Sequence, residues 1–387
     1  MAKLVDARDL KSLGSNTVRV RLPLSAPFYF NVVANGLTKI LCSLDDLVGS
    51  GLVAEAARGS LLPVAEQYAI GITDAMAKLI DPNDPNDPIG LQFLPDQREL
   101  EITPEEQADP IGDAIHSPVE GIVHRYPDRA LLKLVHICPV YCRFCFRREM
   151  VGPDKGEMLS EAVLDAAFAY LAAHSEIWEV VITGGDPLIL SPRRLAAIGE
   201  RLAAIPHIKI VRWHTRVPVV MPEAVTEELT KALKPSGKSV WLAVHANHPR
   251  ELTGDAVAAL ERLSGHGIHL ISQTVLLKGV NNDVATLTAL MRGFVEAGVK
   301  PYYLHHGDLA PGTAHWRTGI TEGKALIDAL RGSLSGLAQP TYVIDLPGGH
   351  GKVPIAPLSC DMEGEGWRMT DWQGYTHVYP PQSDSKR

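Results

Sequence analysis

From residue 131 onward, the chain alternates between short runs that are apolar throughout and longer segments whose apolar residues recur at spacings of three and four. The first pattern is typical of a strand buried on both faces, and the second of an amphipathic helix. The predicted strands are residues 131–137, 180–183, 210–214, 240–245, 269–277 and 301–305. The predicted helices are residues 160–174, 191–204, 223–233, 255–264, 283–297 and 320–335.

Six successive strand–helix units predict a parallel sheet covered by helices, and therefore an α/β fold class. We expect an incomplete (β/α)6 barrel rather than a doubly wound sheet, although periodicity alone does not separate the two folds. Ser191 and Pro192 support the second helix, because serine is a favoured N-cap and proline suits the first helical position. In a parallel barrel, chemistry collects where the strands end.

Two further segments flank the predicted barrel, which spans residues 116–339. Residues 1–115 are predicted to form a mainly helical accessory segment, with helices at 47–57 and 64–80. Residues 81–88 read Asp-Pro-Asn-Asp-Pro-Asn-Asp-Pro, and this recurring proline predicts a rigid extended loop. Residues 340–387 are predicted to be a short C-terminal extension that begins with a seventh apolar run.

Composition narrows the class of protein. The 387 residues, 45% of them hydrophobic, suffice for one large domain with a smaller attachment. The net charge is −8 without any basic block, so we expect no nucleic-acid partner. No apolar run approaches the roughly 20 residues of a membrane span, and the N-terminus lacks the apolar core of a signal peptide. With five cysteines and no disulfide framework, we expect a cytoplasmic protein with reduced thiols.

Three cysteines, Cys138, Cys142 and Cys145, follow the first predicted strand in the spacing C-x3-C-x2-C. Thiolates are soft ligands suited to iron–sulfur clusters, and three of them leave one iron of a 4Fe–4S cube open. The alternatives are a partial zinc site or three unrelated buried cysteines. Structural zinc normally requires four ligands, and the other cysteines, Cys42 and Cys360, are remote in sequence. The spacing therefore favours the cluster.

Glycine-rich loops follow two of the predicted strands. Residues 183–187 read Thr-Gly-Gly-Asp-Pro, where glycines let the backbone approach a ligand, although alone this is an ordinary tight turn. Residues 345–352 read Asp-Leu-Pro-Gly-Gly-His-Gly-Lys. Lys352 is either a surface amine or a desolvated Schiff-base nucleophile, and its place just past a buried strand favours the second interpretation. Lone histidines are more often structural, so His245, His248, His305 and His306 stay unassigned.

Together these motifs resemble the radical S-adenosylmethionine (SAM) enzymes, and within them the lysine 2,3-aminomutase family, from about residue 81 to residue 352. The resemblance implies a radical SAM barrel that binds a 4Fe–4S cluster, SAM and pyridoxal 5′-phosphate (PLP). It implies the cluster on Cys138, Cys142 and Cys145, SAM on Gly184, Gly185, Asp186 and Pro187, PLP on Arg125, Tyr126, Arg129, Gln273 and the catalytic Lys352, and substrate on Arg147, Asp308 and Asp345.

The resemblance also implies a reaction and its partners. A radical derived from SAM takes hydrogen from the β-carbon of L-lysine, and the α-amino group moves to that carbon to give β-lysine. Arg147 is expected to bind the substrate carboxylate, and Asp308 and Asp345 its distal ammonium. Flavodoxin or ferredoxin is the implied type of electron donor, and a homo-oligomer the implied assembly. Some members bind structural zinc through extra C-terminal cysteines, but this chain has only Cys360 there, so the resemblance does not extend to a zinc-stapled interface.

Three alternatives remain open from the sequence. One is a 2,3-aminomutase for another amino acid with a distal cation, such as arginine or ornithine. Another is the β-lysine-forming enzyme of elongation factor P modification. The third is a non-catalytic iron–sulfur electron carrier, which would explain the cysteines but not Arg147 or Lys352.

Overall fold

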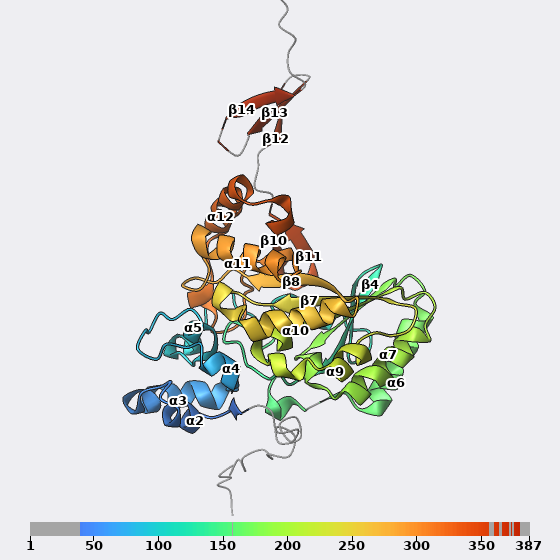
Figure 1. The fold of residues 1–387 in the computed structure, drawn as a ribbon, viewed down its shortest axis with the longest axis horizontal. Helices are drawn as coiled ribbons and strands as arrows, with labels where there is room; N and C mark the ends of the chain where they lie inside the picture. The colour runs from blue at the N-terminus through green and yellow to red at the C-terminus, as the bar shows by residue number, and fades with distance from the viewer. Residues whose placement is uncertain are drawn as a thin grey trace, which may run out of the picture.

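The computed structural model describes residues 39–156, 158–355, 360–363, 366–370, 373 and 375–379. Within these residues the largest sheet has nine strands in the order β11-β10-β9-β8-β7-β6-β5-β4-β3 (Figure 1). The strands are β3 Ile122–Tyr126, β4 Arg129–Val135, β5 Glu179–Gly184, β6 Ile210–Thr215, β7 Ser239–His245, β8 His269–Val275, β9 Lys300–His305, β10 Thr341–Leu346 and β11 Gly351–Pro354. Strands β4 to β10 are mutually parallel, whereas β3 and β11 are antiparallel edges.

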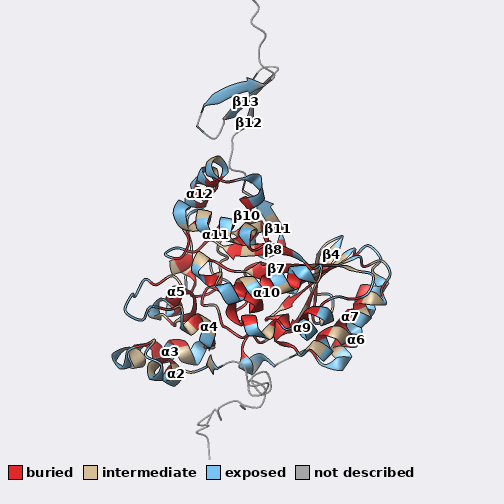
Figure 2. Ribbon diagram, viewed as in Figure 1, coloured by how far each residue is buried: buried red, intermediate tan, exposed pale blue. Residues whose placement is uncertain are grey.

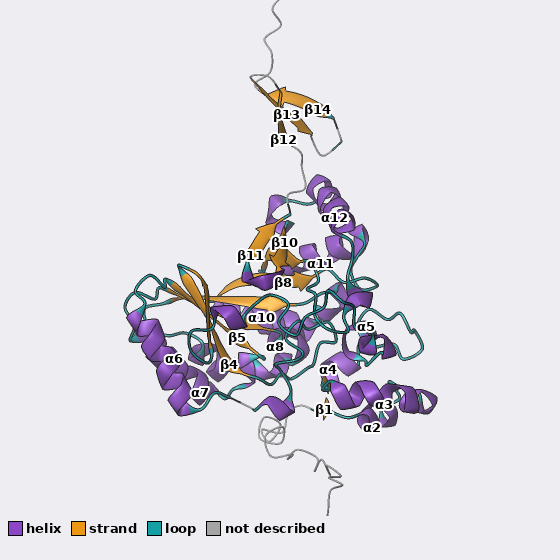
Figure 3. Cartoon of the chain, turned by 180° about the vertical axis from the view of Figure 1, so that it is seen from behind, coloured by secondary structure: helices purple, strands orange, loops and turns teal. Residues whose placement is uncertain are grey.

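The predicted α/β class and the six strand–helix units are confirmed. The helices between successive parallel strands are α6 Glu161–Ala173, α7 Pro192–Ala203, α8 Val217–Val220, α9 Glu227–Ala232, α10 Gly254–Gly265, α11 Val284–Glu296 and α12 Ile320–Ser333. Figure 3 shows the strands from behind, with α6 and α7 at one side of the sheet and α11 and α12 at the other. Among the described residues, the edge strands β3 and β11 do not pair with each other in the sheet, so the barrel is incomplete, as expected.

The strands form the buried centre of the molecule, and the helices expose their outer faces (Figure 2). Trp213 on β6 illustrates the packing between them, because it is fully buried and donates its indole N–H to the Leu233 carbonyl at 3.1 Å. The prediction that Ser191 is an N-cap is also confirmed, since its hydroxyl accepts the Arg194 N–H at 3.4 Å. The barrel therefore follows from strands that are apolar on both faces.

Several element boundaries differ from the predictions. The first parallel strand, β4, ends at Val135 rather than at residue 137. Beside its end, the hydrogen bonds come from the loop after β5 and not from a strand: the Gly185 N–H donates to Val135, and the Asp186 N–H donates to Ile137. The predicted helix 223–233 is instead a 3-10 turn, Pro222–Ala224, followed by α9, because Thr226 caps a new helix. Strands β3 and β11 were not predicted.

The accessory segment is less regular than predicted. Its elements are β1 Ile40–Leu41, α2 Leu44–Gly49, α3 Arg58–Gln67, β2 Ile72–Thr73, α4 Asp74–Ala77 and α5 Gly90–Phe93. The predicted helix 47–57 is wrong, because α2 ends at Gly49 and Gly51 takes a left-handed φ of 76°. The predicted helix 64–80 is also wrong. Helix α3 already ends at Gln67, because Tyr68 takes an extended conformation, and a Cβ on the following Gly71 would lie 2.8 Å from the Tyr141 ring.

The Asp-Pro run forms a series of turns, so the predicted extended loop is wrong. Asp81, Asp84 and Asp87 each accept the backbone N–H two residues later at 2.9 Å, which turns the chain once per repeat. Asp87 is itself buried and pairs with Arg250 at 2.6 Å. The run is thereby fastened to the barrel.

A small antiparallel sheet follows the barrel. Its strands are β12 Cys360–Glu363, β13 Gly366–Thr370 and β14 Thr376–Tyr379. The side chain of Cys360 lies outside the described residues. In the part of the chain that is described, no helix combines the length and apolar character that crossing a membrane requires.

Candidate active site

A cavity of about 470 Å³ occupies the interior of the barrel and its mouth. It brings together residues from every strand of the large sheet and from the loops that follow them. Every site residue predicted from the sequence lines this cavity except Pro187, which is buried at the start of a 3-10 turn. The structure thus gathers side chains that are up to 227 positions apart; their individual roles stay predictions.

The three cysteines lie in a tight loop after β4. The Cys145 N–H donates to the Cys142 carbonyl at 3.1 Å, which turns the loop back on itself. Burial raises the pKa of Cys145 to about 11 and also raises the pKa of Cys138, so a metal must displace the thiol protons to bind. No group of three His, Cys, Asp or Glu side chains among the described residues could hold one metal ion. The fit to a cluster, whose thiolates bind different irons, rests on spacing and position.

Gly184 and Gly185 allow the second loop to touch the cysteine loop. A Cβ on Gly184 would lie 2.4 Å from the Val135 carbonyl oxygen, and one on Gly185 would lie 2.2 Å from that of Ile137. Gly184 also has a φ of 116°, which favours glycine. These glycines are therefore needed for packing beside the cysteines, in addition to any approach to a ligand.

Asp186 has a local structural task as well as its place at the cavity. Its carboxylate accepts the Leu188 N–H at 3.1 Å, the Thr215 hydroxyl at 2.7 Å and the Arg216 N–H at 2.7 Å. It thereby joins the end of β5 to the end of β6. The carboxylate oxygens of Asp186 are therefore already engaged by groups of the protein.

The residues predicted to contact PLP lie around the hairpin of β3 and β4 and on β8. The Arg129 guanidinium stacks on the Tyr126 ring, 3.8 Å from its centroid. Tyr126 accepts the backbone N–H of Lys352 through its hydroxyl at 2.7 Å, which bridges the open edges β3 and β11. Arg125 and Gln273 also line the cavity. Two arginines and a phenol fit a phosphate group.

Lys352 projects from β11 toward the two protein carboxylates that are predicted to bind the substrate ammonium. Its ammonium donates to Asp345 on β10 at 2.5 Å, and the two residues are direct partners in the antiparallel register. Burial works to raise the pKa of Asp345, but the His305 hydrogen bond and the Lys352 charge outweigh it and lower that pKa. Burial and the Asp345 charge raise the pKa of Asp308 to about 7. The two carboxyl groups therefore face the same buried space with different proton affinities.

Arg147 is held by a residue that the sequence did not single out. Its guanidinium donates to Asp113 at 3.1 Å and to the Thr183 hydroxyl at 3.4 Å. Asp113 also accepts from Arg125 at 3.2 Å. Burial raises the pKa of Asp113, but the surrounding cations outweigh burial and lower it, so this carboxylate stays ionised. Asp113 thus links Arg147, the arginine predicted to bind the substrate carboxylate, to Arg125, which is predicted to bind PLP.

Several polar atoms at the cavity have no hydrogen-bond partner among the described residues. They are the Nε atoms of Arg125, Arg147, Arg212 and Arg216, the Nε2 atom of His214 and the Oδ1 atom of Asp345. Buried polar atoms are normally hydrogen-bonded, so these atoms are suited to a polar ligand. The thiols, the cationic hairpin and the amine together fit a cluster, a phosphate-bearing cofactor and an amino acid.

The histidines left unassigned now separate into two groups. His245 and His305 line the cavity, and His305 lies 3.7 Å from Asp345. His248 caps a short 3-10 turn, and His306 bonds to the Tyr342 hydroxyl at 2.7 Å. Asp113, which holds Arg147, carries no local sequence signal, because its role depends on contacts between distant segments.

Family models match two parts of the chain. Residues 132–290 match the model described as the radical SAM superfamily. Residues 327–361 match the model described as lysine-2,3-aminomutase. The first match covers the cysteine and glycine loops, and the second covers Asp345 and Lys352.

Curated relatives extend the similarity over most of the chain. The L-lysine 2,3-aminomutase of Fusobacterium nucleatum is 37% identical over 87% of this chain and 81% of its own length. The L-lysine 2,3-aminomutase of Clostridium subterminale is 41% identical over 74% of this chain and 69% of its own length. The glutamate 2,3-aminomutase of Clostridioides difficile is 36% identical over 80% of this chain and 73% of its own length.

Proposed function

This chain belongs to the lysine 2,3-aminomutase family of radical SAM enzymes, and we propose that it moves the α-amino group of L-lysine to the β-carbon, giving β-lysine. The resemblance inferred from the sequence is thereby confirmed at the level of the family. The protein is an isomerase whose cofactors are a 4Fe–4S cluster, SAM and PLP.

One observation carries the proposal: the lining of a single cavity includes the three cysteine thiols, the Lys352 amine, the Arg147 guanidinium and the carboxylic acids of Asp308 and Asp345. An electron carrier needs only the thiols. A 2,3-aminomutase needs a site for radical generation and a site for an amino acid within reach of each other, and here both share one enclosed space.

The two carboxylic acids favour a substrate with a distal cation. Asp345 has a side chain only 4% exposed, and Asp308 is close enough for the Asp345 charge to raise its pKa. Two buried carboxylates would repel the side-chain carboxylate of glutamate, whereas an ammonium would neutralise them. We therefore propose lysine over the substrate named for the C. difficile relative.

The chain's own residues would bind and orient this substrate. Arg147 would donate guanidinium N–H groups to the α-carboxylate, and this bond would replace part of its present contact with Asp113. The Asp345 carboxylate holds the Lys352 ammonium at 2.5 Å, so the substrate ammonium would take over that contact when Lys352 is displaced. When bound, the cluster and SAM supply one-electron radical initiation, and PLP supplies an electron-delocalising π-system.

Partners, location and assembly follow as further parts of the proposal. A low-potential electron donor of the flavodoxin or ferredoxin type would reduce the cluster, in a cytoplasmic homo-oligomer. The free thiols support a reducing compartment. The proposed division into residues 1–115, 116–339 and 340–387 places the PLP lysine in the last segment, where β10 and β11 complete the sheet.

Anaerobic reconstitution tests the proposed function. The protein is loaded with iron, sulfide and PLP, then incubated with SAM, a reductant and one amino acid, and its products are separated by chromatography. We expect β-lysine from L-lysine and no comparable product from glutamate or norleucine. Arginine or ornithine turning over better than lysine would replace the substrate assignment.

Borohydride reduction tests the role of Lys352. Reduction of the PLP-loaded protein followed by peptide mapping should place the pyridoxyl group on Lys352, since this amine faces the cavity beside the phosphate-binding hairpin. Lys133 is the matched competitor, because burial lowers the pKa of its amine and favours nucleophilic attack. A label on Lys133, or on no lysine of a PLP-loaded sample, would refute the assignment.

A further inference from the structure

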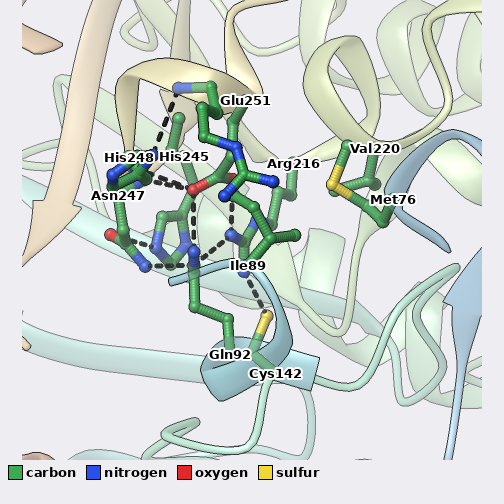
Figure 4. Close-up of polar contacts among 12 residues, drawn as sticks. Met76, Ile89, Gln92, Cys142, Arg216, Val220, His245, Asn247, His248 and Glu251 are labelled. Atoms are coloured by element: carbon green, nitrogen blue, oxygen red, sulfur yellow. Dashed lines mark hydrogen bonds and ion pairs between the residues drawn. The ribbon is translucent and has the colours of Figure 1, made fainter. Parts of the chain in front are cut away.

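Arg216 lies directly after β6, with a side chain only 5% exposed. Its Nη1 atom donates to the Cys142 sulfur at 2.8 Å, as the close-up in Figure 4 shows. The other two cysteines of the loop have different neighbours. Backbone N–H groups of Asp186 and Arg147 face Cys138 and Cys145, respectively. Cys142 therefore takes a cationic side-chain donor, unlike the other two.

A buried polar network fixes the guanidinium in this position (Figure 4). Its Nη2 atom donates to Glu251 and to Gln92, each at 2.6 Å. Gln92 lies on α5 in the accessory segment, and Glu251 lies in the 3-10 turn Pro249–Glu251 after β7. Both are fully buried. The guanidinium therefore cannot swing away from Cys142 without breaking two charge-assisted or polar bonds.

The network is itself anchored by the backbone. Glu251 accepts the Asn247 and His248 N–H groups at 2.9 Å each, and Gln92 also donates to Glu251 at 3.1 Å. The Asn247 amide donates to Gln92 at 3.0 Å. Each member thus has several partners from separate elements, which is the condition for a rigid buried network.

We propose that Arg216 is a positioning residue that raises the reduction potential of the cluster through its bond to the Cys142 sulfur. This inference rests on the proposed function, since it assumes a cluster on the three cysteines. Reduction adds one electron from an external one-electron reductant and one negative charge to the cluster, and no bond forms or breaks. A fixed cationic donor at a ligand sulfur stabilises the reduced form more than the oxidised form. An arginine keeps its proton throughout.

The alternative is that Arg216 only balances the buried charge of Glu251. The two explanations predict different potentials. If Arg216 only balances this charge, a double substitution that removes the charges of Arg216 and Glu251 together should leave the cluster potential unchanged. The proposed role predicts a more negative potential whenever the donor to Cys142 is lost, even if the fold is intact.

The test is a potentiometric titration of the reconstituted, SAM-free protein, monitored by the electron paramagnetic resonance signal of the reduced cluster. The Arg216→Met/Glu251→Gln variant removes the donor and the buried charge pair together. At the native midpoint potential, we expect its ratio of reduced to oxidised cluster to be at least about tenfold lower, which corresponds to 59 mV for one electron. Arg216→Lys keeps the positive charge but loses the two Nη atoms that bond to Cys142 and to Glu251 and Gln92 at the same time, so its midpoint potential should shift in the same direction.

Arg250→Lys is the matched control. Arg250 joins the same 3-10 turn to the accessory segment through Asp87, at 2.6 Å, but does not reach the cysteine loop. Its variant should keep the native potential. A native midpoint in both Arg216 variants at native iron content would overturn the inference. If the double variant fails to fold, the Arg216→Lys result decides alone. Failure of the native protein to assemble a cluster would instead overturn the proposed function.

Discussion

Replacing Cys142 by Ala should reduce SAM cleavage to the background measured without protein. Three thiolates are the protein ligands that the cavity offers to the cluster, and an alanine leaves a second iron without one. The Arg216 guanidinium would also lose its sulfur acceptor and face the vacancy. The measurements are iron and sulfide content after anaerobic reconstitution, and 5′-deoxyadenosine release with SAM and dithionite. Cys138→Ala and Cys145→Ala should behave in the same way.

Cys42→Ala provides the control for thiol chemistry in general. Cys42 is an exposed free cysteine in the accessory segment, and its sulfur contacts only the nearby Ile40 carbonyl, at 3.5 Å, among the bonds of the described residues. Its variant should keep native iron content and SAM cleavage. A Cys142→Ala protein with a full cluster and native SAM cleavage would overturn the cluster assignment.

Asp308→Asn should lower kcat/KM for lysine by two to almost four orders of magnitude. Removing one partner of a buried charged contact costs about 3–5 kcal/mol, which is a factor of roughly 10² to 5 × 10³ in rate or affinity. Asp308 is the cleaner of the two carboxyl positions, because Lys352 bonds to Asp345 instead. PLP loading, measured by its absorbance, and cluster content should therefore stay native in this variant.

The pH profile separates charge recognition from a loss of folding. The pKa of Asp308 is raised to about 7, so the group is mainly protonated below that pH and ionised above it. The native apparent affinity for lysine should therefore fall as the pH drops through 7, by at most about tenfold per pH unit. In Asp308→Asn this slope should disappear. A native-like slope in the variant, or equal turnover of norleucine and lysine, would contradict recognition of an ammonium.

Asp345→Asn is the informative companion because it removes two contacts. It should weaken lysine binding and also release the Lys352 ammonium, which its carboxylate holds at 2.5 Å. A change in the yield of borohydride trapping on Lys352 is therefore expected in Asp345→Asn but not in Asp308→Asn. Comparing the two variants therefore separates recognition of the substrate from the positioning of the Lys352 amine.

The barrel was predictable from the sequence because its strands are buried on both faces and its helices on one. Periodicity reports such burial directly, as at 210–214, which the structure extends by one residue to Thr215. The accessory segment was mispredicted for the complementary reason. Helix α3, for example, ends where Tyr68 becomes extended and its ring packs against Arg148, and such a tertiary contact has no local signature.

The candidate site divides in a similar way. Cysteine spacing and glycine-rich loops are local patterns imposed by chemistry, and the residues they indicated converge on one cavity. Asp113 and Arg216 were missed because an isolated aspartate or arginine has no spacing to distinguish it. Their partners lie on other segments: Asp113 bonds to Arg147, and Arg216 to Cys142. Such contacts depend on the tertiary fold.

The bond from the Lys352 N–H to the Tyr126 hydroxyl has a consequence for the order of biosynthesis. These residues are 226 positions apart, an interval that a ribosome takes on the order of 10–50 s to translate. The cysteine loop, the glycine loop and most of the barrel leave the ribosome during that time, before the amine exists. The cysteines proposed to hold the cluster are therefore synthesised well before the lysine proposed to bind PLP.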